Sequence, residues 1–389
     1  MSKPTIRVLV VDDSVVIRRL VSEILAAHAN IEVVGTAQNG KVALAKMAEL
    51  KPDAVTLDIE MPVMDGISCL RELRKTYPRM PVVIFSTLTE RGAAATLDAL
   101  AAGASDYVTK PSNVGSITES RQNISEQLIP KLIALTGARR LVVRSAALPA
   151  PMPVPAGVRP ATGAGGRRAT PYSVLTIGSS TGGPDALAVL LSALPRDLPV
   201  PVVVVQHMPP LFTRMLAQRL DGNCPLRITE AAEGDVVERG RVLIAPGGRH
   251  LEVRTKGATV VVHLTDAPPE NFCRPAVDVL FRSISAVYRN RVLGVVLTGM
   301  GRDGAQGATV IRNAGGEIFA QDEASSVVWG MPGAVVTAGQ ADRVLPLNQM
   351  AGQITATLMK NQGSPAPGTR EPTSTGRHSN PAMPTGVGA

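Results

Sequence analysis

Short apolar runs alternate with helically spaced apolar residues over the first third of the chain. The runs are Ile6–Val11, Ile31–Thr36, Ala54–Leu57, Met80–Phe85 and Asp106–Thr109. Helical spacing appears between them, over Val15–Ala27, Lys41–Leu50 and Ala93–Ala102. Strands that alternate with helices predict a parallel, doubly wound sheet. In such a sheet, functional groups collect where the strands end.

The same alternation begins again at Tyr172. Strands are predicted at Val174–Ile177, Val202–Gln206, Val242–Ala245, Val292–Thr298 and Glu317–Ala320, with helices over 185–194, 211–220, 276–289 and 304–314. The segment Leu251–Leu264 alternates like a hairpin around Lys256-Gly257. We therefore expect a second α/β domain, with a mostly parallel sheet and a small antiparallel annex.

A segment of different composition separates the two patterns. A helix is predicted over Ile124–Leu135, and residues 136–172 are then rich in Ala, Pro, Gly and Arg. Such a segment buries too little apolar surface to order itself, and the end of the chain is similar. The predicted division is a first domain over 1–125, a flexible linker over 126–171, a second domain over 172–362 and a disordered tail over 363–389.

Composition narrows the class of protein. The net charge of +8 suggests nucleic acid, but the basic surplus lies mainly in the linker, among Pro, Gly and Ala. A DNA-binding regulator also needs a helix-turn-helix unit, and the strand-rich second domain argues against one. No apolar run approaches the ~18 residues of a membrane span. The three cysteines form no CxxC pair and no leader is evident, so we expect a cytoplasmic protein that neither binds nucleic acid nor inserts into a membrane.

Polar residues follow four strands of the first domain. They are Asp12 and Asp13, Asp58, Ser86 or Thr87, and Lys110. Carboxylates that converge on one rim repel each other unless a hard cation neutralises them, and Mg²⁺ is the natural choice. Each residue alone has an ordinary explanation, as a helix cap, a strand end or a turn. The combination is what predicts a phosphoryl site.

The first domain resembles a response-regulator receiver domain. The matching pieces are Val11-Asp12-Asp13-Ser14, Asp58-Ile59-Glu60-Met61-Pro62-Val63-Met64-Asp65-Gly66 and Thr109-Lys110-Pro111. The resemblance implies that Asp58 accepts the phosphoryl group and, with Asp12 and Asp13, binds Mg²⁺, while Lys110 contacts the phosphoryl group. It favours Ser86 over Thr87 as the accompanying hydroxyl.

Three reactive residues follow strands of the second domain. Ser180 lies in the turn Gly178-Ser179-Ser180-Thr181-Gly182, His207 follows Val202–Gln206, and Asp303 follows Val292–Thr298. A nucleophile, a base and an orienting carboxylate are what acyl transfer needs. The turn also fits G-x-S-x-G, although the order Ser…His…Asp differs from that of the α/β-hydrolases. The same turn could instead cradle a phosphate, and Ser180 alone could be a helix cap.

A rival motif overlaps this set. Gly299-Met300-Gly301-Arg302-Asp303-Gly304 reads G-x-G-x-x-G after a strand, and the acidic pair Asp322-Glu323 follows the next strand, as in a dinucleotide-binding fingerprint. The carboxylate of Asp303 would repel a pyrophosphate there, and the motif leaves His207 unexplained. Acyl transfer accounts for more of the residues. His250 could line the same cleft without being the base.

Both domains, in order, resemble the chemotaxis response regulator protein-glutamate methylesterase/protein-glutamine glutaminase family. The carriers are Ser179-Ser180-Thr181-Gly182-Gly183-Pro184, Gln206-His207-Met208-Pro209, Ala245-Pro246-Gly247, Leu297-Thr298-Gly299-Met300-Gly301-Arg302-Asp303-Gly304, Ala320-Gln321-Asp322-Glu323 and Gly330-Met331-Pro332. The chain departs from the pattern at Ala276 and Gly333, which are possible substrate contacts.

The resemblance implies a Ser180–His207–Asp303 triad with oxyanion donors near Thr181 and Met300, and no cofactor for the ester chemistry. The implied reaction is hydrolysis of glutamate γ-methyl esters, and deamidation of glutamines, on chemoreceptor cytoplasmic domains. A histidine kinase would phosphorylate Asp58 and thereby relieve inhibition by the receiver. The alternative is a regulatory adaptor that binds a nucleotide or a receptor without esterase activity.

Overall fold

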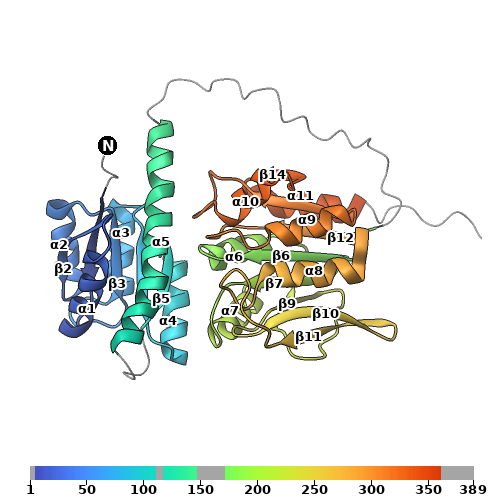
Figure 1. Cartoon of the computed structure of the whole chain (residues 1–389), viewed down its shortest axis with the longest axis horizontal. Helices are drawn as coiled ribbons and strands as arrows, with labels where there is room; N and C mark the ends of the chain where they lie inside the picture. Colours follow the sequence, from blue (N-terminus) through green and yellow to red (C-terminus); the bar gives the residue numbers. More distant parts are fainter. Residues whose placement is uncertain (1–4, 111–116, 147–170, 361–389) are drawn as a thin grey trace, which may run out of the picture.

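The computed structural model describes residues 5–110, 117–146 and 171–360, which form two domains side by side (Figure 1). Each domain has a parallel sheet with helices packed against it. The sheet of the first domain has the order β2-β1-β3-β4-β5, and that of the second β14-β13-β12-β6-β7-β9-β8. The strands β10 and β11 form a separate antiparallel pair. The predicted fold class is confirmed.

The first domain alternates strands and helices throughout. Its strands are β1 Ile6–Val11, β2 Ile31–Ala37, β3 Ala54–Asp58, β4 Val82–Ser86 and β5 Asp106–Thr109. Its helices are α1 Val15–Ala26, α2 Gly40–Leu50, α3 Gly66–Thr76, α4 Glu90–Ala101 and α5 Ile117–Ala146. Side-chain oxygens of Ser14, Asn39, Asp65 and Thr89 cap the first four helices, which places each helix start one residue after a polar residue.

The second domain carries the larger sheet. Its strands are β6 Val174–Ser179, β7 Val202–Gln206, β8 Arg227–Glu230, β9 Arg241–Ile244, β10 His250–Lys256, β11 Thr259–Thr265, β12 Val292–Val296, β13 Glu317–Gln321 and β14 Arg343–Leu345. Its helices are α6 Gly183–Ser192, α7 Phe212–Asp221, α8 Val277–Tyr288, α9 Ala305–Asn313, α10 Met331–Thr337 and α11 Leu347–Lys360, with the short 3-10 turn η1 Arg289–Arg291. The sequence pattern missed the short edge strands β8 and β14, whose residues are largely polar or partly exposed.

Helix α5 crosses the boundary expected at residue 125 and continues to Ala146. Leu128, Leu132 and Leu135 are buried in the same apolar cluster as strand β1. Their spacing gives the helix one apolar face. The Ala, Pro, Gly and Arg-rich composition of the residues that follow obscured this pattern in the sequence. The rest of the expected linker, 147–170, and the expected tail, 363–389, lie outside the described residues.

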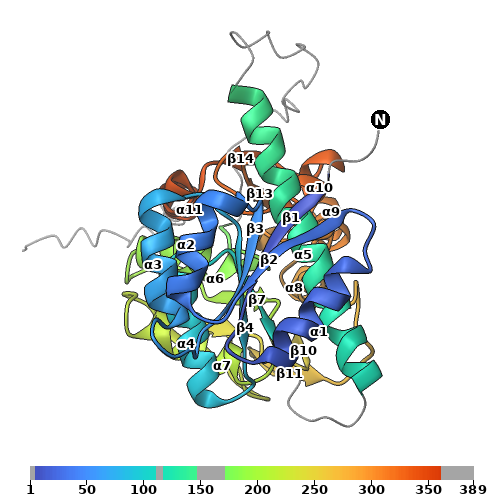
Figure 2. The same ribbon diagram turned by 90° about the vertical axis from the view of Figure 1, so that its left-hand side faces the viewer.

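The two domains pack directly against each other through α4 on one side and α6 and α7 on the other. The Tyr107 ring stacks on the Phe212 ring, with centroids 4.9 Å apart and planes within 4°. Two ion pairs join the helices at the rim of the contact: Glu90 with Arg214 at 2.8 Å and Asp98 with Arg219 at 2.5 Å. Seen from its own side, the first domain lies in front of the second (Figure 2).

Candidate active site

Ser180 lies in a tight turn between β6 and α6. Its N–H donates to Thr298 O at 3.0 Å, and its carbonyl accepts from Gly183 N at 2.7 Å. The Gln206 amide holds the same turn, donating to Ser180 O at 3.0 Å and accepting from the Ser179 hydroxyl at 2.6 Å. A Cβ on Gly183 would lie 1.9 Å from Gln206 Oε1, so the turn needs glycine at this position. Gln206 is therefore a positioning residue that the sequence did not single out.

The three predicted residues follow neighbouring strands. Strand β6 pairs with β7 on one side and with β12 on the other, and these strands end before Ser180, His207 and Asp303 respectively. Chain order reverses at β6, since β7, β9 and β8 lie on one side and β12, β13 and β14 on the other. Ligands of open α/β sheets bind at such a switch point.

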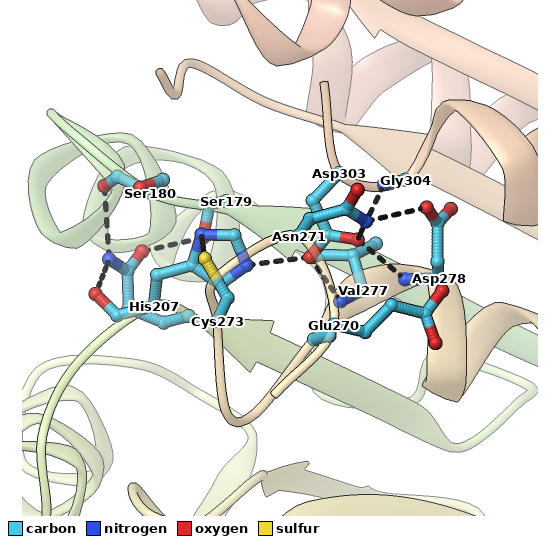
Figure 3. Close-up of polar contacts among 12 residues, drawn as sticks. Ser179, Ser180, His207, Glu270, Asn271, Cys273, Val277, Asp278, Asp303 and Gly304 are labelled. Carbon is cyan, nitrogen blue, oxygen red and sulfur yellow. Dashed lines mark hydrogen bonds and ion pairs between the residues drawn. The ribbon is translucent and has the colours of Figure 1, made fainter. Parts of the chain in front are cut away.

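His207 and Asp303 form a close pair. The Asp303 Oδ2 atom lies 2.8 Å from His207 Nε2 and also accepts from Val277 N at 2.6 Å (Figure 3). Its Oδ1 atom accepts from Asp278 N and Gly304 N, both at 3.0 Å. Burial by itself raises the pKa of Asp303, but His207 and these N–H groups lower it below its ordinary value. The carboxylate is thus held ionised and fixed in direction.

These contacts also remove the dinucleotide alternative. The Asp303 carboxylate accepts the N–H of Gly304, a donor of the turn that would cradle a pyrophosphate. An anion would have to displace this carboxylate from its donors. The glycine pattern at 299–304 therefore serves the Asp303 site.

Ser180 and His207 line the same cavity. Within residues 171–360 no hydrogen bond links the Ser180 hydroxyl to His207; the Nδ1 atom of His207 lies 3.4 Å from Cys273 Sγ instead. Figure 3 shows Ser180 on one side of the imidazole and Asp303 on the other. Burial alone would lower the pKa of His207. The contacts with Asp303 and Cys273 outweigh burial and raise this pKa from its ordinary value to about 9.

Two backbone N–H groups beside Ser180 are available to donate hydrogen bonds to an oxyanion. In the described part of the second domain, neither Thr181 N nor Met300 N donates to a protein acceptor. Thr181 follows Ser180 directly, and Met300 follows β12 next to it. Gly299 N and Gly330 N, by contrast, are bonded to Val328 O and Gly299 O.

Two residues considered from the sequence prove to be structural. His250 is fully buried, with Nδ1 accepting from Ala276 N at 3.2 Å and Nε2 3.1 Å from Pro268 O. Ala276 is also fully buried, at the N-cap of α8, so it cannot touch a substrate. The expectation of a substrate contact at Ala276 is wrong, because the position belongs to a helix start.

Comparison with known proteins covers both domains. Residues 8–122 match the response regulator receiver domain model, and residues 175–354 match the CheB methylesterase model. A protein-glutamate methylesterase/protein-glutamine glutaminase of Nocardioides sp. is 56% identical over 371 residues, covering 94% of this chain and 98% of the relative. The chain belongs to this family. Proteins of the same name from Trichodesmium erythraeum and Symbiobacterium thermophilum are 48% and 47% identical, each covering 90% of the chain and 98% and 96% of the relative.

The receiver domain of this methylesterase family member gathers the predicted acidic residues at the end of its sheet. Asp12, Asp13 and Asp58 have carboxylate oxygens within 4.8 Å of one another. Lys110 Nζ lies 2.9 Å from Asp12 and 2.8 Å from Asp58. Burial and the Asp12 charge raise the pKa of Asp58 to about 6, although Lys110 opposes them. The excess negative charge and the oxygen donors fit a hard divalent cation such as Mg²⁺.

The hydroxyl predicted to accompany Asp58 belongs to either Ser86 or Thr87. Ser86 ends β4, is buried, and contacts Gly92 O at 3.0 Å and the Thr96 hydroxyl at 2.5 Å. Thr87 is exposed, and its hydroxyl lies 3.2 Å from that of Thr89. Neither hydroxyl is bonded to Asp58 among the described residues, so the choice of Ser86 stays a prediction.

The receiver domain covers the Ser180 turn. Asp106 Oδ2 accepts a hydrogen bond from the Thr181 hydroxyl at 2.5 Å, and Lys131 Nζ lies 2.9 Å from the other oxygen of the same carboxylate. Residues of both domains enclose a cavity of about 20 Å³ beside Ser180 and His207. That volume admits about one water molecule, which is too little for an ester group on a side chain.

Proposed function

We propose that this chain hydrolyses glutamate γ-methyl esters on chemoreceptor cytoplasmic domains and deamidates receptor glutamines, under control of its receiver domain. The observation that carries the proposal is the His207–Asp303 pair beside Ser180, with the buried Asp303 carboxylate on the imidazole and the receiver over the site. The names of close relatives over nearly the whole chain support the same activity. No described helix has the length and apolar content needed to cross a bilayer, and we assign the protein to the cytoplasm with its substrates.

The proposed chemistry uses the Nδ1 atom of His207. Since Asp303 is hydrogen-bonded to Nε2, the Nδ1 atom accepts the proton of Ser180. The imidazole must first move away from the Cys273 thiol, which lies at Nδ1 in this structure. The Ser180 oxygen attacks the ester carbonyl, and the N–H groups of Thr181 and Met300 stabilise the oxyanion, at about 3 kcal/mol for a single donor in comparable sites. His207 then protonates the departing methanol, or ammonia from glutamine. Water, deprotonated by His207, releases glutamate from Ser180.

The proposed control follows from the closed cavity. In the arrangement described, Asp106 and Tyr107 of the receiver occupy the approach to Ser180, so a substrate needs the domains to separate. Phosphorylation of Asp58 by a histidine kinase would favour separation only by lowering the free energy of the undocked state relative to the docked one. Asp12, Asp13 and Asp58 would hold Mg²⁺, which supplies charge neutralisation for phosphoryl transfer at that site.

The decisive experiment incubates methylated receptor peptides with protein treated with a small phosphodonor and follows loss of the methyl group by mass spectrometry. Demethylation should be strong with wild type, weak with Asp58→Asn and absent with Ser180→Ala. Undiminished hydrolysis by Ser180→Ala would refute the nucleophile. The non-enzymatic adaptor instead predicts no demethylation by any form and no labelling of Ser180 by a fluorophosphonate.

A further inference from the structure

The segment between β11 and α8 contacts both members of the His207–Asp303 pair, through Cys273 and Asn271. His250 holds both ends of this segment, through Pro268 O and Ala276 N. Glu270 and Cys273 exchange two backbone hydrogen bonds, at 3.1 and 2.9 Å, which close a tight loop. The Glu270 carboxylate is fixed by both terminal nitrogens of Arg282, at 2.7 and 2.6 Å. The loop is therefore anchored at its base and its middle.

Asn271 of this loop bridges two buried carboxylates. Its Nδ2 atom donates to Asp303 Oδ1 at 2.9 Å and to Asp278 Oδ2 at 3.0 Å, as Figure 3 shows. An amide nitrogen has two protons, so both are used, one for each carboxylate. The backbone of Asn271 has φ of 51°, a left-handed conformation that asparagine tolerates better than most residues.

The second carboxylate makes this donor necessary. Asp278 is 1% exposed and Asp303 is 2% exposed. Asp278 has no ion-pair partner within residues 171–360; its other oxygen accepts from Gly307 N at 2.6 Å. Burial, and then the charge of Asp303, raise the pKa of Asp278 to about 6. Without a shared donor, two buried carboxylates would face each other behind the catalytic pair, and repulsion would turn or protonate one of them.

We infer that Asn271 is a positioning residue of the reaction, which holds Asp303 Oδ2 on His207 by engaging Asp303 Oδ1 and separating it from Asp278. The inference rests on the proposed Ser180–His207–Asp303 triad. Its role is indirect, since Asn271 touches neither Ser180 nor His207 in the described contacts. Its loop also carries Cys273, so a single segment contacts the far side of Asp303 and Nδ1 of His207.

The test compares Asn271→Ala and the isosteric Asn271→Asp with wild type, using the full chain treated with phosphodonor and a methylated receptor peptide. A hydrogen bond to a charged group is worth enough that kcat should fall by about 10- to 100-fold. KM should stay within about twofold, because Asn271 acts on the reacting groups and does not contact the peptide. Asn271→Asp should be at least as impaired, because it adds a third carboxylate.

Controls separate this inference from misfolding and from failure of the proposed function. Asn348→Asp makes the same chemical change at an exposed position in the first turn of α11 and should leave kcat unchanged. Thermal unfolding of each variant identifies any that fail to fold, and Asn271→Asp keeps the size of the side chain. A folded Asn271→Asp with wild-type kcat, beside an inactive Ser180→Ala, would overturn the inference alone. Activity in Ser180→Ala would overturn the triad itself.

Discussion

At the scale of single residues, the geometry of the site depends on which atoms of neighbouring side chains are in contact. Asp303 takes Nε2 of His207, which leaves Nδ1 for Ser180, yet Cys273 lies at that nitrogen. Gln206, the last residue of β7, holds the serine turn through two hydrogen bonds and makes a third to His207 O. The proposed catalytic residues thus have polar neighbours that fix the positions of their side chains.

The pH dependence of Ser180 reactivity should reflect His207. With a pKa of about 9, the imidazole is protonated at neutral pH in the closed arrangement and cannot accept the serine proton. Labelling of Ser180 in unphosphorylated protein needs brief separation of the domains and a neutral His207. Since the closed arrangement predominates, the pKa of His207 in that arrangement sets the fraction of neutral imidazole, and labelling should rise as pH increases through about 9. Because the pKa lies above that of the unfolded chain, the stability that the His207–Asp303 pair contributes is complete below about pH 6.5 and is lost as pH rises through about 9.

Cys273→Ala provides the matched comparison for that profile. It removes one of the contacts that raise the pKa of His207, so the rise in labelling should move to lower pH. The measurement is the labelling rate of each form against pH with a fluorophosphonate. Identical profiles for the two forms would show that Cys273 does not influence His207.

At the scale of elements, α5 extends the receiver beyond the boundary that composition suggested. Leu132 is fully buried against the receiver sheet, whereas its neighbour Ile133 is 40% exposed. Leu132→Ala should lower the free energy of unfolding by about 2–5 kcal/mol, and Ile133→Ala by less than about 1 kcal/mol. Denaturant unfolding of the full chain, followed by circular dichroism, measures both. Equal effects of the two substitutions would contradict the placement of α5.

The order of strands at β6 has a similar consequence for the second domain. Because β7 and β12 flank β6, residues far apart in sequence end at the same edge of the sheet. Ser180, His207 and Asp303 reach one site without any sequence proximity, and the loop before α8 contacts His207 and Asp303.

At the scale of the whole molecule, the domain interface is the element that we propose to be regulatory. Its centre is the Tyr107–Phe212 stack, and its rim has ion pairs between α4 and α7. Arg219 lies 2.5 Å from the Asp98 carboxylate, so Asp98→Arg replaces this attraction by repulsion between two cations. Partly exposed pairs contribute up to about 1 kcal/mol, so esterase activity without phosphorylation should rise by about two- to fivefold.

The reciprocal change tests whether this effect comes from docking. Adding Arg219→Asp to Asp98→Arg restores opposite charges and should return the unphosphorylated rate towards wild type. Activity of the fully phosphorylated forms should be alike, because neither residue lies at Ser180. If the double variant stays as active as Asp98→Arg, the ion pair does not control closure.

Alternation of apolar runs determined the two parallel sheets, because strands buried on both faces need continuous apolar residues. Strand ends likewise indicated the candidate site residues Asp12, Asp58, Ser180, His207 and Asp303, since functional groups of such sheets collect where the strands end. Only the tertiary structure decided the length of α5, the structural role of His250, and the contacts of Asn271, Gln206 and Cys273. These features depend on contacts between side chains across a loop or an interface, and the spacing of residues along the chain does not predict such contacts. The same holds for the closed cavity at Ser180, which exists only where two separately folded surfaces come together.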